Sequence, residues 1–348
     1  DVSGLGADHL NDVDLNDIKQ IEIVKGPSSL LYANGTIGGI INVVDDCIAP
    51  EDFDKPQLDV GYESQSVNDG SSEFMNYKNN FNGFNVNFGY KNTEFGNYDV
   101  PHGAVIHEEE DDHDEEELSY IENSDYAVEA TKFGISKVGD WGYVGISVDN
   151  LESLYGIPFH GEEHDENEET PHNDDDDDHD GHDDHDDHDD HDHGNLIHAN
   201  YVQEDAEFDG YEIEFGRTFD LGAGEMTLSF GRDVVNAQFT DGHNVPRINP
   251  ARNVYSLSYA QDDIVFKLHL KDVEKQNDVG EGETATAGYQ MLDTRLTKTF
   301  DLSGKSKLKV SLFGKNLLDE VARNHSSFVK NEVPLPGRNY GIKFNLTY

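Results

Sequence analysis

Residues 84–90 read FNVNFGY, and this short segment carries the pattern from which the architecture of the chain follows. Its aromatic and aliphatic residues alternate with Asn and Gly, and the same period of two recurs in residues 226–230 (MTLSF) and 342–348 (IKFNLTY). Because successive side chains of a β-strand point to opposite faces, each segment predicts a strand with one apolar and one polar face. Such strands follow one another from residue 56 onward, separated by turns rich in Gly, Asn and Asp.

Two architectures fit this alternation. In a water-soluble sandwich the apolar faces form the core, whereas in an outer-membrane barrel they point at lipid and the polar faces line the lumen. The connections favour the barrel, because short ones on one side alternate with long ones on the other. The short connections are residues 138–140, 221–224, 261–263 and 302–305, and the long ones are residues 93–125, 153–196, 240–252, 277–288 and 321–338. A transmembrane helix is not expected, since no run of about 18 apolar residues occurs.

The same pattern predicts about twelve strands in all, five before the longest loop and seven after it. They lie near residues 57–64, 73–81, 83–93, 126–137 and 141–151 before that loop, and near residues 199–219, 225–239, 252–260, 263–274, 287–300, 306–318 and 338–348 after it.

The first fifty residues have a different character. Residues 13–44 read VDLNDIKQIEIVKGPSSLLYANGTIGGIINVV, in which a short strand ends at Gly26-Pro27 and a second strand follows a glycine-rich turn. This segment resembles the C-terminal part of the plug domain of TonB-dependent outer-membrane receptors, where I/V-E-V-x-R/K-G-P precedes G-x-I-G-G and I-N-I/V. Lys25 stands where that family usually has Arg, and Ala33 where Gly often follows the Tyr. The glycines match neither phosphate-binding pattern, so nucleotide binding is not predicted.

Two C-terminal segments resemble the same family. Residues 313–320 (FGKNLLDE) are similar to its V-x-N-L-F-D-x segment, and residues 336–348 (PGRNYGIKFNLTY) to its closing P-G-R-x-Y/F strand. We therefore expect an all-β fold, a transmembrane antiparallel β-barrel, with residues 1–50 as a partial plug domain and residues 51–348 as the barrel. Because the family has about 22 strands, the middle strands would be missing, and closure of the remainder is an open question. The chain begins with Asp1 and lacks the front of a plug, so we interpret it as processed or incomplete.

The formal net charge of −49 is concentrated in two runs. Residues 108–117 (EEEDDHDEEE) hold nine acidic residues and residues 161–193 hold nineteen, with no Lys or Arg in either run. The lack of a basic face argues against nucleic acid as a partner and favours cations. Cys47 is the only cysteine, so no intramolecular disulfide and no cysteine zinc cluster can form, and a structural or incidental role is expected for it.

The loop at residues 153–198 is the predicted metal-capturing element. Residues 172–194 read HNDDDDDHDGHDDHDDHDDHDHG, with His at every third position from 179 to 191, a spacing that a mere solubility tail does not require. Imidazole is a common zinc ligand and carboxylates add charge and oxygen donors, whereas calcium does not use imidazole. The predicted ligands of this loop are His160, His164, His172, His179, His182, His185, His188, His191, His193 and His198, and the acidic loop at residues 94–125 adds His102, His107 and His113.

The order of two features is similar to the zinc-uptake branch of the receptor family. In that branch a D-H pair precedes the plug motif and a His-rich loop follows the fifth strand, as Asp8-His9 and residues 153–198 do here. Residues 244–252 (NVPRINPAR) also resemble a late segment of these receptors. The resemblance implies that the loop concentrates Zn²⁺, that Asp8 and His9 receive it at the plug apex, and that the TonB system opens the path inward. Metal affinity of the loop is expected to fall between about pH 7 and pH 5.5, because His binds metal only when neutral.

Other interpretations stay open. The same scaffold could carry copper, nickel or a metal chelate such as a siderophore, or the chain could be a soluble metal-buffering β protein. His9 could be an ordinary plug-surface residue, and His243, His269 and His325 are expected to be isolated lumen or loop residues. No catalytic arrangement is visible, so no enzyme and no prosthetic group are expected. The expected partners are a divalent metal ion, Zn²⁺ above all, the TonB energy-transducing system and outer-membrane lipid, and the expected location is the bacterial outer membrane.

Overall fold

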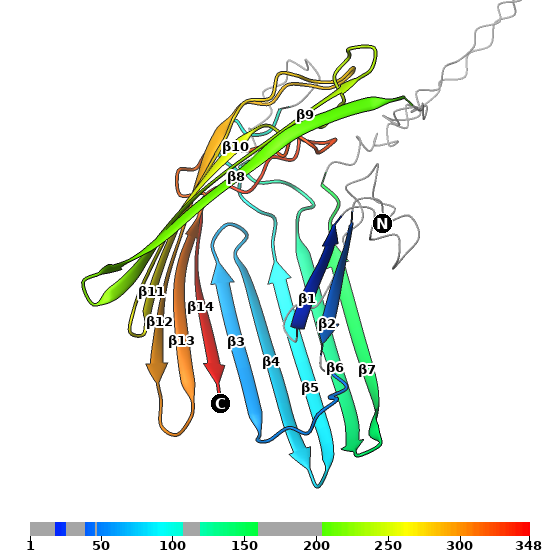
Figure 1. Cartoon of the computed structure of the whole chain (residues 1–348), viewed down its shortest axis with the longest axis vertical. Helices are drawn as coiled ribbons and strands as arrows, with labels where there is room; N and C mark the ends of the chain where they lie inside the picture. Colours follow the sequence, from blue (N-terminus) through cyan, green and yellow to red (C-terminus); the bar gives the residue numbers. More distant parts are fainter. Residues whose placement is uncertain (1–17, 26–38, 46, 107–118, 159–203) are drawn as a thin grey trace, which may run out of the picture.

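The computed structural model describes residues 18–25, 39–45, 47–106, 119–158 and 204–348. In these parts all regular structure is β-strand, and the strands form one sheet of two strands and one of twelve (Figure 1). No helix in the described parts is long and apolar enough to cross a membrane. The predicted all-β, antiparallel fold is confirmed.

The small sheet pairs two antiparallel strands, and the large sheet contains the rest of the strands. The small sheet consists of β1 (Ile18–Lys25) and β2 (Gly39–Asp45). The large sheet consists of β3 (Gln57–Gln65), β4 (Gly70–Phe81), β5 (Phe84–Phe95), β6 (Tyr126–Gly139), β7 (Gly142–Tyr155), β8 (Ala206–Leu221), β9 (Gly224–Phe239), β10 (Arg252–Gln261), β11 (Ile264–Val273), β12 (Tyr289–Asp301), β13 (Lys307–Lys315) and β14 (Asn339–Thr347). These twelve strands correspond to the twelve that the alternation predicts.

The order of strands in the large sheet is β7-β6-β5-β4-β3-β14-β13-β12-β11-β10-β9-β8. Strands that follow one another in sequence pair with each other, except β7 and β8, which form the two ends of the sheet. β14 returns to pair with β3 and joins the two halves of the chain. The turn between β4 and β5 shows how the sequence sets this meander. Asn82 and Gly83 have φ of 55° and 83°, which suits the tight hairpin turns that match the twist of the strands.

The two faces of the large sheet differ as the sequence predicts. Register pairs place the apolar residues of neighbouring strands on one outer face, where they form an exposed belt across the described strands. Members of this belt on eight different strands are Tyr62, Phe133, Ile146, Phe215, Tyr255, Leu296, Leu312 and Phe344. The opposite, inner face is polar, and Asn85, Asn87 and Ser136 are buried on it. This belt is the surface that a membrane protein presents to hydrocarbon.

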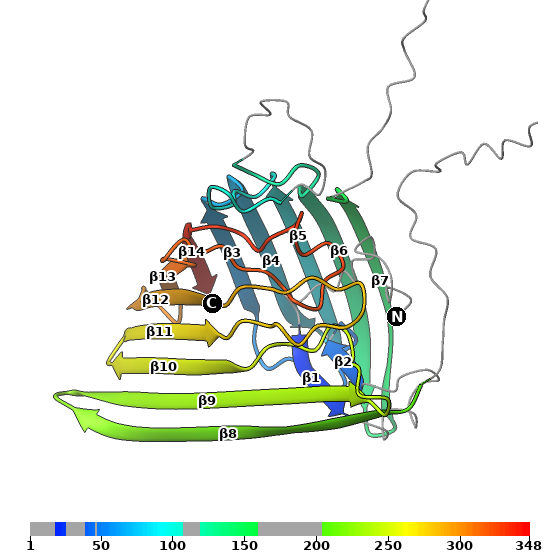
Figure 2. The same cartoon turned by 90° about the horizontal axis from the view of Figure 1, so that it is seen from above.

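The β1–β2 hairpin lies inside the concave side of the large sheet (Figures 1 and 2). The segment that follows it, residues 47–54, runs along the inner wall and is held there by hydrogen bonds. Ser136 Oγ donates to the carbonyl of Ala49 at 2.8 Å, and Asn85 both accepts from the amide of Phe53 and donates to the carbonyl of Glu51. Buried Cys47 is part of this contact, which agrees with a structural role.

The large sheet is curved but open. Figure 2 shows it as an arc whose ends are β7 and β8, and these two strands make no contact with each other. Both end strands are exposed along almost their whole length. The alternation predicts the wall of a barrel, and the described strands form such a wall without closing it.

Candidate functional site

The structured long loops gather at one end of the sheet, and the short turns lie at the other (Figure 1). The loops are residues 96–106 with 119–125, 240–251, 274–288 and 316–338. Their positions confirm the predicted division between a long-loop side and a short-turn side. The residues that flank the two acidic runs belong to this same end, where Gly156 donates to the carbonyl of Asp125 and Thr240 to that of Asp205.

A small apolar core holds two of these loops together. Val100, Ala104 and Ile121 are buried against partly buried Val321 and Val333 of the last loop. Two hydrogen bonds add to this contact, because the hydroxyl of Tyr98 donates to Pro334 O at 2.9 Å and the amide of Gly337 donates to Asp99 O at 2.9 Å. Burial raises the pKa of Tyr98 to about 12, so its hydroxyl stays a donor at physiological pH.

The two C-terminal sequence motifs meet in the last loop. Asn316 of FGKNLLDE is buried with φ of 45°, and its amide donates to Glu320 O at 3.0 Å and Pro336 O at 3.1 Å. Arg338 of PGRNY donates from its backbone to Asp319 and from its side chain to Leu317 O. The motif residues therefore fold the loop onto itself.

A charged cluster joins three loops around the carboxylate of Glu283. The backbone amide of Arg247 lies 3.0 and 3.1 Å from the two carboxylate oxygens, and the amide of Gly280 donates to one of them at 3.0 Å. Lys330 Nζ lies 3.4 Å and His325 Nε2 3.2 Å from Oε1. The side chains of these two residues are only 6% and 1% exposed. We call Glu283, His325, Lys330 and Thr286 the Glu283 cluster.

The protonation states within the Glu283 cluster follow from these contacts. Burial alone would raise the pKa of Glu283, but the amides of Gly280 and Arg247, helped by Lys330, lower it below its usual range. Burial, together with nearby Lys330, lowers the pKa of His325 although Glu283 opposes the shift. His325 is therefore neutral at pH 7. Its Nδ1 shares a hydrogen bond of 2.9 Å with Thr286 Oγ1, while the approach of Nε2 to Glu283 lacks the angle of a hydrogen bond.

The Glu283 cluster has a structural role, because its contacts hold three loops together. Its carboxylate already accepts from two backbone amides and faces Lys330, which leaves no charge to attract a metal ion. In the described part of the chain no group of three or more His, Cys, Asp and Glu side chains could hold a metal. The cluster instead fixes the loops at the long-loop end of the sheet.

Nearly all predicted metal ligands lie outside the described residues. These are Asp8, His9, His107, His113 and the ten histidines between His160 and His198. His102 is the exception, and it is exposed on the loop after β5, four residues before the described part of that loop ends at Ile106. The structure thus puts His102 at the long-loop end and leaves its role as a ligand a prediction.

The three histidines expected to be isolated occupy three different settings. His325 is buried in the Glu283 cluster, and His269 lies on the inner face of β11 opposite Asp293 of β12. His243 is exposed in the loop after β9, where its Nδ1 lies 2.8 Å from Asp241 Oδ2. That hydrogen bond and the charge of Asp241 raise the pKa of His243. The expected inner-face and loop positions are confirmed, but His325 and His243 are not isolated, because each contacts an acidic residue.

The inner face carries a charge pattern that the sequence reasoning missed. Register pairs bring basic residues of β10 to β14 onto the same inner surface, which we call the basic wall. It consists of Arg252, Lys267, Lys271, Arg295, Lys307, Lys309, Lys315 and Lys343. Only part of this charge is offset, by the pairs Lys343–Glu63 at 3.2 Å and Lys307–Asp301 at 3.6 Å among others. The signal was present in the sequence, since these residues share the parity of the polar face.

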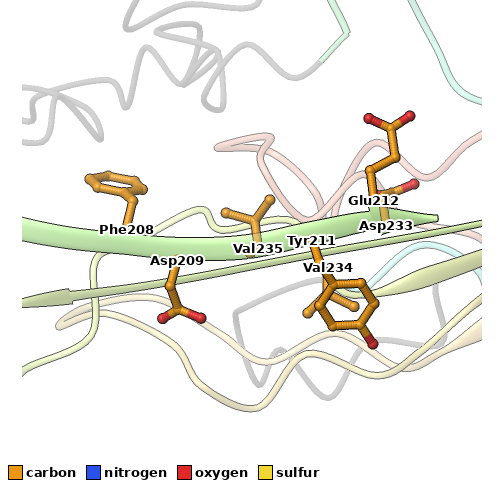
Figure 3. Close-up of a pocket in the computed structure, with 8 residues that line it drawn as sticks. Phe208, Asp209, Tyr211, Glu212, Asp233, Val234 and Val235 are labelled. Atoms are coloured by element: carbon orange, nitrogen blue, oxygen red, sulfur yellow. The ribbon is translucent and has the colours of Figure 1, made fainter.

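A shallow depression lies on the β8–β9 ribbon, and Figure 3 shows why it is not a ligand site. Phe208, Val235 and Glu212 point to one side of the ribbon, and Asp209 and Tyr211 point to the other. Its lining therefore belongs to the two opposite faces of an edge hairpin, and no enclosed volume exists between them.

Comparison with known proteins gives two results. Residues 2–40 match the family model described as the TonB-dependent Receptor Plug Domain. The whole chain is similar to two solved structures of the FrpB iron transporter from Neisseria meningitidis. The F3-3 variant has a TM-score of 0.58 and 10% sequence identity, over 97% of this chain and 88% of that one. The F5-1 variant, in its apoprotein form, has a TM-score of 0.59 and 10% identity over the same shares of both chains.

At this identity the likeness establishes the fold alone, which is that of the FrpB iron transporter. The plug match covers most of the segment in which the sequence motif was found, up to residue 40, and both results agree with the outer-membrane location expected from the sequence. Both of these solved structures are of an iron transporter.

Proposed function

We propose that this chain is a TonB-dependent outer-membrane receptor that captures zinc ions and imports them, with residues 1–50 as a partial plug and residues 51–348 as the barrel wall. One observation carries the proposal: the His-rich segment is attached at the end of the sheet where the long loops gather. Its flanking residues, Gly156 and Asp205, are hydrogen-bonded there to Asp125 and Thr240, which adjoin β6 and β9. The described residues at both ends of the segment therefore lie on the side that would face outside the cell.

The chemistry of the segment suits capture more than storage. Nineteen carboxylates between residues 161 and 193 raise the local concentration of cations, and interspersed imidazoles select zinc and its neighbours over calcium. Redundant, weak sites release ions as readily as they bind them. Asp8 and His9 of the plug would then receive the ion, and the TonB system would move the plug to open the path to the periplasm.

Uptake of radioactive zinc tests this function. Cells that lack their own high-affinity zinc uptake should accumulate ⁶⁵Zn²⁺ when they express the chain, and collapse of the proton gradient should abolish the gain. Replacing His179, His182, His185, His188 and His191 together by Asn should lower uptake at low zinc and leave the maximal rate unchanged. His243→Asn is the matched control, since that histidine is exposed at the same end but lies outside the run. Equal ⁶⁵Zn²⁺ uptake by the unaltered chain, the variant with five His replaced and His243→Asn would refute the role of the segment.

A second candidate function rests on the basic wall. A row of Lys and Arg on the inner face repels a bare divalent cation and attracts an anionic metal chelate. Lys267 and Arg295 face each other across β11 and β12 on this wall. If the cargo is an anionic chelate, Lys267→Gln with Arg295→Gln should lower uptake of ferric citrate and leave ⁶⁵Zn²⁺ uptake intact. Lys298→Gln, on the outer face of β12, serves as the control.

A further inference from the structure

The two ends of the large sheet present long rows of unpaired backbone groups. β7 spans 14 residues and β8 spans 16, and in the described residues each pairs with a neighbour on one side only. In the hydrocarbon region of a membrane every backbone N–H and C=O needs a partner, and exposed sheet edges do not occur there. If the chain acts in the membrane as proposed above, both edges must be covered.

The two edges are complementary to each other. β7 runs from the short-turn end to the long-loop end, and β8 runs the opposite way, so the two would pair in the antiparallel manner of the rest of the sheet. Both edges carry large apolar residues on the outer face, where Ile146 of β7 and Phe215 of β8 are 66% and 63% exposed. Pairing β7 with β8 would therefore continue the apolar belt without a break.

Pairing within one chain does not fit the curvature. Closure by one chain would pair β7 with β8, whereas these two strands are the ends of the sheet and make no contact with each other. The concave side also holds the β1–β2 hairpin and residues 47–54. A lumen that encloses a plug is a property of barrels with about 22 strands, and lumens shrink as strand number falls.

We propose that a second copy of this chain closes the barrel. In a two-fold arrangement about the barrel axis, β7 of each copy pairs with β8 of the other, and the two twelve-stranded arcs form one ring of twice that number. Both junctions are the same, no edge is left, and the strand number stays even, as in bacterial outer-membrane barrels. The long loops of both copies then lie on one side of the membrane. This inference rests on the proposed membrane function, because an edge in water needs no cover.

Crosslinking between differently tagged chains tests the proposal. With Cys47 replaced by Ser, one tagged chain carries Ile146→Cys and the other carries Phe215→Cys, and both are expressed in the same cells. Val148→Cys and Ile213→Cys extend the test to neighbouring registers. A short bis-maleimide should then link the two tags into one band of twice the chain mass in the outer-membrane fraction. Leu257→Cys on the outer face of β10 is the control, because β10 already pairs with β9 and β11 and cannot pair with β7. It should give no such band with Ile146→Cys.

Three results would refute the proposal that a second copy closes the barrel. A chain carrying both Ile146→Cys and Phe215→Cys that links only within itself would show a twelve-stranded closed barrel. Absence of a link at every register, with the internal pair Ile135→Cys and Ile146→Cys on β6 and β7 still linking, would show that another protein covers the edges. A band of twice the mass that also forms with Leu257→Cys would show random collision in the membrane. Absence of the folded chain from the outer-membrane fraction would instead refute the proposed function itself.

Discussion

Replacing Glu283 by Gln should loosen the long-loop end of the molecule without changing its shape. The carboxylate accepts from the amides of Arg247 and Gly280 at 3.0 Å, and Lys330 Nζ lies 3.4 Å from it. A Gln side chain can keep one amide partner, but its NH₂ group cannot accept from the other, and Lys330 loses its counter-charge. Breaking a buried charge pair costs about 3–5 kcal/mol. Because the side chain of Glu283 keeps 8% of its exposure, we expect the lower end, about 3 kcal/mol.

Hydrogen exchange in detergent solution would measure this loss directly. The amides of Gln276 and Thr286 bond to each other's carbonyls within the same loop, so they report its opening. A loss of about 3 kcal/mol corresponds to roughly hundred-fold faster exchange, since about 1.4 kcal/mol is a factor of ten. Glu281→Gln, an exposed acid two residues away, should leave both amides unchanged. Exchange at the same rate in Glu283→Gln and in the unaltered chain would refute the view that this carboxylate ties the loops together.

Three further predictions concern the loops and the wall. The pKa of His325 lies below its ordinary value, so its neutral form stabilises the fold above about pH 6.5. This stability falls as the pH drops from there through the pKa of the folded state. Hydrogen exchange of the loop amides should therefore become faster in acid, and His325→Gln should remove that increase. Asn316→Ala leaves the amide of Glu320 and the carbonyls of Glu320 and Pro336 without their hydrogen-bond partner. It should lower the free energy of unfolding by about 1–3 kcal/mol, which would be measured as a lower Tm. Leu257→Lys places a charge on the outer face, which costs about 2–4 kcal/mol near the membrane centre, so it should reduce the amount of folded chain in the outer-membrane fraction. Ser258→Lys, on the inner face, should leave that amount unchanged. An equal loss in both variants would contradict the assigned faces.

The strands could be read from the sequence because one local rule generates them. Phe84 and Asn85 differ in polarity since they face lipid and lumen, and this contrast repeats on every strand. The Glu283 cluster could not be found in this way. Glu283 and Lys330 come from loops 47 positions apart, and no period relates them. Closure is likewise a collective property, because the curvature of the sheet depends on all of its strands and on what lies inside it.

Acidic and basic residues occupy different parts of the inner face, and these parts favour different candidate cargoes. β8 and β9 present Glu212 and Asp233 on the inner side of the ribbon, and Arg252 of β10 pairs with Asp233 at 2.7 Å where the basic wall begins. A bare divalent cation that leaves the acidic loops would be held by the β8–β9 side and repelled by Lys267 and Arg295, and an anionic chelate would follow the opposite wall. Glu212→Gln with Glu214→Gln should therefore slow zinc uptake alone. A variant of the acidic side that slowed ferric citrate uptake would show that neither wall sorts the cargo by charge.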